Sequence, residues 1–144
     1  SMFNNYKFTN GRPVTRSFIT WYAFSFKDQE LLDLKESFQI EHIYAKQRHI
    51  MENKLSDPSN LESLGNKILL EESINIRASD YQFEGKRKIY SGQERRGKNK
   101  ESSKIAEIKQ FSQQEKFDEQ DIINRQNNII NKFIHNLKLE NLID

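Results

Sequence analysis

The sequence predicts an α+β fold, in which a two-stranded hairpin and a short helix are flanked by an N-terminal helix and a long C-terminal helix. Two observations predict the hairpin: β-branched and aromatic residues alternate over 38–44, and a Gly-Asn turn at 65–66 leads into an apolar run. A third observation predicts the long helix, because apolar residues recur at helical spacing over 122–137.

Composition limits the possible classes of protein. With 144 residues, 35% of them hydrophobic and 31% charged, the chain is expected to be one domain with a modest core and a solvated part. The absence of cysteine excludes disulfides, thiolate zinc sites and cysteine nucleophiles. No apolar run approaches the ~20 residues that cross a bilayer, and no signal peptide opens the chain, so we expect a cytoplasmic protein without membrane contact.

The N-terminal segment, 1–36, is predicted to be helical. Pro13 suits the first turn of a helix, and the bulky residues that follow it, to Phe26, favour a buried face. Trp21 could offer a base-stacking platform, but packing into the core is the simpler interpretation. The leucines of 31–34 predict a short helical turn before the first strand.

The first strand carries a carboxylate beside an imidazole. Alternation places His42 on the face of Phe38 and Ile40, and Glu41 on the opposite face. Glu41 and His42 therefore point into one site only if the strand twists or ends there. The polar stretch 46–49 and the turn cluster within 51–63 are predicted to form the loop between the two strands.

The second strand and the helix after it supply two amides. Asn66 lies in the turn before the strand 68–70, where it could hold the loop and the imidazole or be an ordinary turn residue. The acidic residues at 71–72 suit the first turn of a helix, on which Glu71 and Asn75 share a face. Ile74 and Ile76 are expected to anchor this helix to the core.

Four motifs in order carry a resemblance to a known family. They are Glu41-His42-Ile43, Leu64-Gly65-Asn66, Asn75, and the pattern Phe83-x-x-Lys86-x-x-x-Tyr90. With them, residues 37–92 resemble the HNH (His-Me finger, ββα-metal) nuclease domain at the C-terminus of GmrSD-type restriction enzymes. The chain departs from that family at Ala45, where a proline is usual, and at Asn75, where many HNH nucleases carry histidine.

The resemblance implies a metal-dependent DNA endonuclease of a restriction or anti-phage defence protein. The implied catalytic residues are His42 as the general base, Asn66 and Asn75, and the implied metal ligands are Glu41 and Asn75. Because the implied ligands offer oxygens, Mg²⁺ or Mn²⁺ is the expected ion. The alternative is a catalytically silent module that binds nucleic acid or docks on a partner.

Positive charge gathers after the motifs, in 86–104, where a flexible basic linker, 93–104, precedes the C-terminal helices of 105–144. This charge could be a solvated run, but next to a nuclease motif it favours contacts with phosphates. The predicted nucleic-acid-binding residues are Arg77, Lys86, Arg87, Lys88, Arg95, Arg96, Lys98 and Lys100. The resemblance also implies a longer protein whose separate N-terminal region binds nucleotide and senses DNA. In line with this, the chain itself has no Gly-x-x-x-x-Gly-Lys loop.

Overall fold

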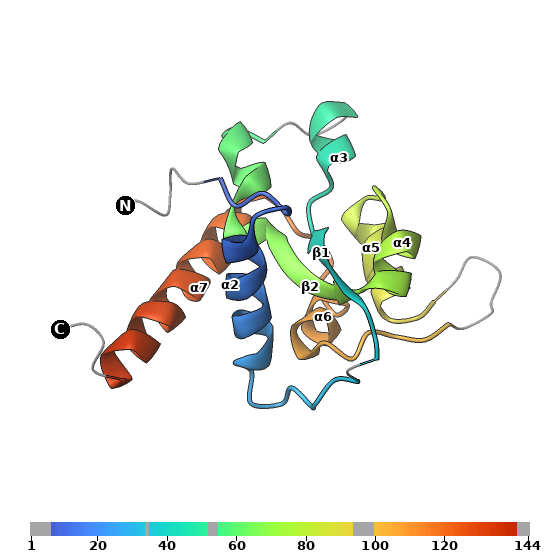
Figure 1. The fold of residues 1–144 in the computed structure, drawn as a ribbon. Coiled ribbons are helices and arrows are strands. Elements are labelled where there is room, and N and C mark those ends of the chain that lie inside the picture. Colours follow the sequence, from blue (N-terminus) through green and yellow to red (C-terminus); the bar gives the residue numbers. More distant parts are fainter. Residues whose placement is uncertain (1–6, 34, 52–54, 94–99, 141–144) are drawn as a thin grey trace.

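The structure, a computed structural model, describes residues 7–33, 35–51, 55–93 and 100–140. At its centre lies an antiparallel hairpin of two strands, β1 (Phe38–His42) and β2 (Lys67–Glu71), which is the only sheet in these residues (Figure 1). The register pairs Phe38 with Glu71 at one end and His42 with Lys67 at the other. The α+β class and both predicted strands are confirmed.

Helices surround the hairpin. Figure 1 shows α2 and α7 on one side of it and α4 and α5 on the other, with α3 beyond the end of β1. The helices are α2 (Pro13–Phe24), α3 (Lys46–Met51), α4 (Glu72–Ala78), α5 (Phe83–Tyr90), α6 (Ala106–Phe111) and α7 (Glu119–Leu139), with the 3-10 turns η1 (Pro58–Glu62) and η2 (Leu64–Asn66).

The N-terminal helix forms as predicted. Pro13 is its first residue, and the side chains that α2 buries, Thr15, Ile19, Tyr22 and Ala23, share one face. Trp21 is partly buried and meets the ring of Phe133 on α7 edge-on, with ring centroids 5.6 Å apart. The packing interpretation of Trp21 is therefore confirmed.

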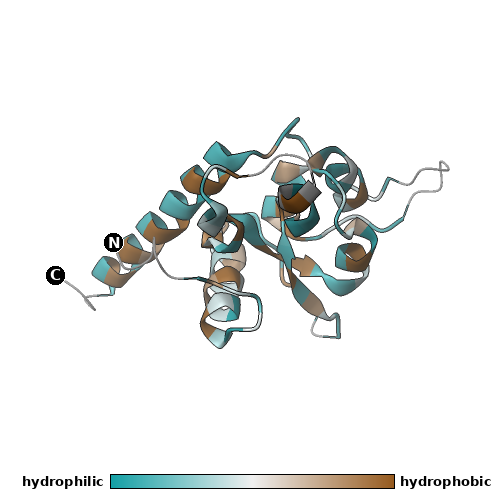
Figure 2. Ribbon diagram, turned by 90° about the horizontal axis from the view of Figure 1, so that it is seen from above, coloured by the Kyte–Doolittle hydropathy of each residue, from teal (hydrophilic) through white to brown (hydrophobic). Residues whose placement is uncertain are grey.

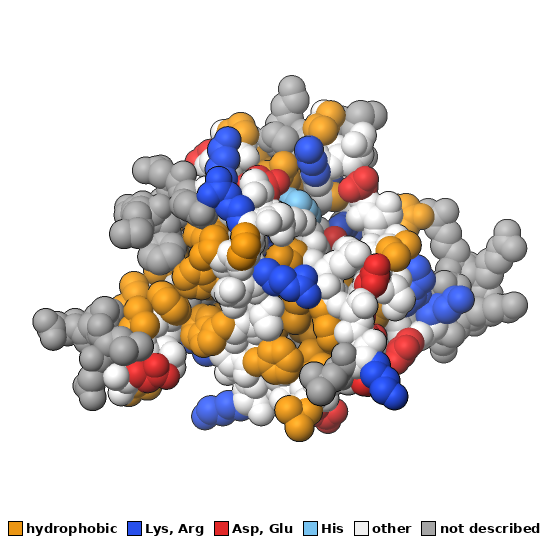
Figure 3. All heavy atoms as spheres, in the orientation of Figure 1, with side chains coloured by type: hydrophobic (Ala, Val, Ile, Leu, Met, Phe, Trp, Pro, Cys, Tyr) orange, Lys and Arg blue, Asp and Glu red, His pale blue; other side chains and the backbone are white. Residues whose placement is uncertain are grey.

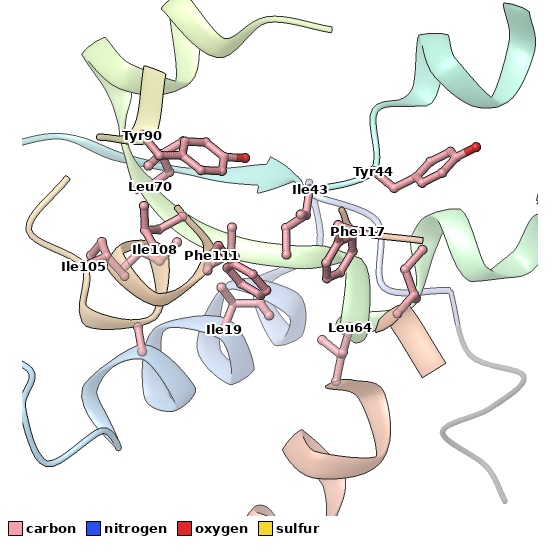
Figure 4. Packing of buried hydrophobic residues seen from close by; sticks show 14 of the residues in the cluster. Ile19, Ile43, Tyr44, Leu64, Leu70, Tyr90, Ile105, Ile108, Phe111 and Phe117 are labelled. Atoms are coloured by element: carbon pink, nitrogen blue, oxygen red, sulfur yellow. The ribbon is translucent and has the colours of Figure 1, made fainter. Parts of the chain in front are cut away.

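The hydrophobic core lies between the hairpin and the helices. Figure 4 shows Ile19 from α2 and Ile108 and Phe111 from α6 converging on the hairpin side chains around Leu70. All five residues of β2 are buried, because helices or loops cover both of its faces. Further from the core, α7 alternates hydrophobic and hydrophilic residues along its length (Figure 2).

Hydrophobic side chains also reach the surface. On the face shown in Figure 3 they form a band over α2 and along α7, with lysine and arginine side chains scattered around it. Phe133 of α7 packs edge-on against Phe18 of α2, with ring centroids 4.8 Å apart. Phe18 and Trp21 of α2 therefore both pack against Phe133 of α7.

Three local expectations are wrong. Residues 31–33 form no helix and Leu31 is 97% exposed, because so short a segment cannot offset the cost of helix nucleation; Leu34 lies outside the described residues. The polar stretch after β1 is the helix α3 and not a loop. Ile76 is 66% exposed, because α4 turns Ile74 and Ala78 toward the core and the opposite face outward.

The turn before β2 is joined to α7 by a buried arginine. Arg125 makes a two-pronged ion pair with Glu107 of α6, with both N···O distances 2.7 Å. Its remaining nitrogen donates to the carbonyl oxygens of Leu64, Gly65 and Lys67. One side chain thus fixes η2 and the start of β2 against two helices.

Gly65 allows this close approach. A Cβ atom on Gly65 would lie 1.9 Å from the carbonyl oxygen of Ile122, and the Gly65 N–H donates to Gln126 Oε1 at 2.9 Å. A contact with backbone cannot be relieved by turning a side chain. The glycine of the Leu-Gly-Asn motif is therefore required for the packing of α7.

We predict that Gly65→Ala lowers the free energy of unfolding by about 2 kcal/mol or more, because the added methyl group collides with the α7 backbone. Urea denaturation of both variants measures this. The control is Gly11→Ala, where an added Cβ meets nothing within 4 Å, and its expected change is within about 0.5 kcal/mol. Equal stability of the two variants would contradict the prediction.

Candidate functional site

Glu41 lies in a buried network with α5. Its carboxylate is 3.0 Å from Lys86 Nζ and accepts a hydrogen bond from the Tyr90 hydroxyl at 2.9 Å. Lys86 also donates to the carbonyl oxygen of His42 at 2.8 Å. Burial raises the pKa of Glu41, against the opposing effect of Lys86. The motif Phe83-x-x-Lys86-x-x-x-Tyr90 is thus the buried face of α5, which clamps β1.

His42 points to the other side of the hairpin. Its Nε2 atom is 3.0 Å from Glu62 Oε1 and 3.0 Å from Lys67 Nζ. The second oxygen of Glu62 accepts from Lys67 at 2.6 Å, and Asn10 Oδ1 accepts from the same ammonium. The imidazole is 21% exposed, whereas the lysine side chain is completely buried. We call these four residues, Asn10, His42, Glu62 and Lys67, the histidine cluster.

Glu62 stays ionised in the histidine cluster. Partial burial acts to raise its pKa, but the hydrogen bonds and charges of His42 and Lys67 outweigh this effect and lower the pKa to about 2. Burial lowers the pKa of Lys67, and Glu62 opposes that change. The imidazole therefore lies against a carboxylate and an ammonium that neutralise each other.

The position of Glu62 depends on two neighbouring side chains. Asn66 is fully buried, and its amide donates to the carbonyl oxygens of Tyr44 and Leu61, each at 3.0 Å, and accepts from the Tyr44 N–H at 2.6 Å. At the other end of η1, Glu119 of α7 accepts from the N–H groups of the turn at 56–57. Asn66 thus holds the loop from inside, and its side-chain hydrogen bonds in the described residues go to Tyr44 and Leu61 and not to the imidazole.

Asn75 lies away from His42. Its amide donates to Gln39 Oε1 at 2.6 Å, and Gln39 in turn donates to Glu72 at 3.2 Å. Gln39 and His42 are three positions apart on β1, which places them about 10 Å apart and on opposite faces. The structure therefore does not bring Asn66, Asn75 and the imidazole of His42 into one contact.

A divalent ion between Glu41 and Asn75 does not fit this arrangement. Both carboxylate oxygens of Glu41 are occupied by Lys86 and Tyr90, and the side chain is only 5% exposed. Within the described ranges, no group of three or more His, Asp and Glu side chains is placed to hold a metal. Mg²⁺ or Mn²⁺ dependence stays a prediction, and we assign no ligand set to the ion.

The predicted nucleic-acid-binding residues have different environments. Lys86 is 1% exposed and cannot reach DNA, so that assignment is wrong; its place on the buried face of α5 is the reason. Lys88 and Lys100 are exposed, whereas Arg87 is partly buried and bonded to Glu84 and the Gln114 carbonyl. Arg77 donates to the Glu101 carbonyl. The remaining three, Arg95, Arg96 and Lys98, lie outside the described residues.

The sequence did not reveal three members of the histidine cluster. Lys67 offered a signal, since it is a lysine at the start of an apolar strand and the hairpin register places it opposite His42. Glu62 and Asn10 offered no such signal, because their positions depend on η1 and on the segment before α2.

In the described part of the chain, no helix is both long and apolar enough to cross a membrane.

Comparison with known proteins finds a family that matches most of the chain. Residues 1–132 match the family described as the C-terminal domain of GmrSD restriction endonucleases. No curated protein and no solved structure matches the chain. The match covers every element from α2 to the middle of α7, and so includes the histidine cluster and the Glu41 network.

We predict that Glu41→Ala lowers the free energy of unfolding by about 3–5 kcal/mol, because it leaves the Lys86 ammonium buried without its partner. The control is Glu84→Ala, which removes a carboxylate that is 53% exposed and pairs with Arg87 at the surface. Its expected cost is at most about 1 kcal/mol. Urea denaturation measures both, and an equally small effect for Glu41 would contradict its structural role.

Proposed function

The chain belongs to the family of GmrSD restriction endonuclease C-terminal domains, and from this we propose that it is an HNH-type endonuclease that hydrolyses phosphodiester bonds of DNA. His42 is the general base. The family membership makes the chain a nuclease domain of the restriction-endonuclease type. The base, the substrate and a role in defence against foreign DNA are our proposal.

The observation that carries the proposal is the contact between His42 and Glu62. A general base needs an imidazole that solvent can reach and that a second group orients. His42 meets both needs, since it is 21% exposed and its Nε2 atom lies 3.0 Å from the Glu62 carboxylate. His135, by contrast, lies exposed on α7 and makes no hydrogen bond or ion pair with the described residues, and the side chain of His49 is not among those that the structure describes.

The proposed reaction is a water-mediated displacement at phosphorus. His42 takes a proton from a water molecule while the water oxygen forms a bond to phosphorus. The bond from phosphorus to the leaving sugar oxygen breaks, and that oxygen takes a proton from solvent. His42 then returns its proton to water, so the side chain is unchanged at the end of the cycle.

An alternative function remains, that of a catalytically silent module that binds DNA or docks on a partner. The observation that favours it is that two of the expected site residues are already bonded to other side chains of the protein. Glu41 is committed to Lys86 and Tyr90, and Asn75 is bonded to Gln39. Metal-dependent nicking of plasmid by the isolated chain separates the two functions.

We predict that His42→Ala abolishes plasmid nicking while DNA affinity stays near that of the wild type, because the base acts on water and not on the duplex. Agarose gels measure the nicking, and filter binding measures the affinity. The matched control is His135→Ala, since His135 is an exposed histidine on α7. Nicking at the same rate by both variants would remove His42 from the reaction.

We predict that nicking requires Mg²⁺ or Mn²⁺ and that Zn²⁺ does not support it. The charge that develops on the phosphate needs a cation, and Lys67 and Lys86 are too deeply buried to supply it, with 0% and 1% of their side chains exposed. Cysteine thiolates, which favour zinc, are absent from the sequence. Nicking assays after chelation and readdition of each ion test this, and full activity in chelator would contradict it.

We predict that DNA binding rests on phosphate contacts, shows little sequence preference and weakens steeply with salt. Changing Arg95, Arg96, Lys98 and Lys100 to Ala should lower affinity about equally for all sequences and flatten the salt dependence by about 0.9 per lost contact. The control replaces four exposed lysines elsewhere with Ala: Lys27, Lys109, Lys116 and Lys138. Tight, salt-insensitive binding to one sequence would show that target selection resides in this chain.

A further inference from the structure

Two groups compete for one nitrogen of His42. Glu62 Oε1 and Lys67 Nζ both lie 3.0 Å from Nε2. A carboxylate only accepts hydrogen bonds and an ammonium only donates them. If Nε2 carries a proton it bonds to Glu62, and if Nε2 is bare it accepts from Lys67. The two contacts therefore belong to different proton arrangements of the same ring.

The two arrangements have opposite chemical consequences. With the proton on Nε2, the basic lone pair is on Nδ1, and no hydrogen bond to Nδ1 is recorded among the residues that the structure describes. With Nε2 bare, the proton is on Nδ1 and the only lone pair of the ring is taken by a buried ammonium. Only the first arrangement leaves His42 able to accept a proton from water.

The other contacts of the lysine favour the first arrangement. Lys67 Nζ is 2.6 Å from Glu62 Oε2 and 2.5 Å from Asn10 Oδ1, so its shortest contacts go to oxygens and not to the ring. Asn10 is itself fixed, since its amide donates to the Ile40 carbonyl at 3.1 Å. Two of the three ammonium N–H groups are thus held by oxygens, so Lys67 does not depend on Nε2 as an acceptor, and Nε2 can bond to Glu62.

We propose that Glu62 is the positioning residue of His42: it accepts the Nε2 hydrogen bond and thereby makes Nδ1 the nitrogen that takes the proton from water. This inference rests on the proposed function for its catalytic meaning. The part of Lys67 is to hold the second oxygen of Glu62, so that the carboxylate keeps one oxygen directed at the ring.

The roles of the two Glu62 oxygens make Glu62→Gln a sharp test. Lys67 requires an acceptor, so the amide oxygen of glutamine should take the place of Oε2 and its NH₂ group the place of Oε1. That NH₂ group donates to Nε2, which must then lose its proton to Nδ1. A substitution that keeps size and shape is therefore expected to move the ring proton and disable the base.

The first measurement needs no variant. In ¹⁵N-labelled wild-type protein at about pH 8, above the usual histidine pKa of ~6.5, the nitrogen shifts of His42 show which ring atom carries the proton. The signals are assigned by their loss in His42→Ala. We expect a protonated Nε2 and a bare Nδ1, and the reverse result would overturn the proposal.

The second measurement compares Glu62→Gln with Glu115→Gln, which removes the same charge from an exposed glutamate outside the cluster. For Glu62→Gln we expect the proton on Nδ1 and nicking slower by about a hundredfold or more, with DNA affinity retained. Glu115→Gln should keep both the wild-type tautomer and the wild-type nicking rate. A Glu62→Gln protein that keeps Nε2 protonated, or that nicks as the wild type does, would overturn the assignment.

The experiments distinguish failure of the endonuclease proposal from failure of the role given to Glu62. If the wild-type chain does not nick DNA under any metal condition, the endonuclease proposal fails, while the ring nitrogen shifts still decide whether Glu62 sets the tautomer. If the wild type nicks and His42→Ala nicks equally well, His42 is not the base. Thermal unfolding of each variant shows whether a lost activity reflects a lost fold.

Discussion

The structure depends most on Arg125, the buried arginine of α7 that joins the hairpin to the helices. Its guanidinium carries five N–H donors at fixed angles. Here it donates both to the carboxylate of Glu107 and to the carbonyl oxygens around η2. Its carbon also lies 5.4 Å from the ring centre of Tyr22 on α2. An apolar residue could fill this space, but it could not satisfy the carbonyl groups that the close approach of Gly65 removes from water.

The alternation of β1 divides the charged groups into two networks with different exposure. On one face, Glu41 meets Lys86 and Tyr90 in the interior, where its side chain is only 5% exposed. On the other face, His42 meets Glu62, whose side chain is 24% exposed. Both networks pair a carboxylate with a buried lysine, but only the second holds an imidazole and reaches solvent, which makes it the candidate catalytic network.

Helix packing sets the geometry of the histidine cluster from a distance. Glu62 ends η1, whose start is held by Glu119 of α7 and whose end is held by the amide of Asn66. Lys67 begins β2, directly after the turn that Arg125 binds. A change in the position of α7 would therefore move both groups that contact the imidazole, although α7 contributes no residue to the cluster.

The sequence by itself determined the elements whose pattern is local. Alternation over 38–44 and the apolar run after Asn66 predicted both strands, Pro13 and the bulky residues after it predicted α2, and helical spacing predicted α7. The sequence also identified His42 as the candidate general base, and it showed that a regular strand turns Glu41 and His42 to opposite faces. Only the tertiary structure decided what those side chains contact, because Tyr90 lies 49 positions from Glu41, and Asn10 lies 57 positions from Lys67. Contacts over such separations depend on how the helices pack around the hairpin, and no periodicity in the sequence encodes that packing.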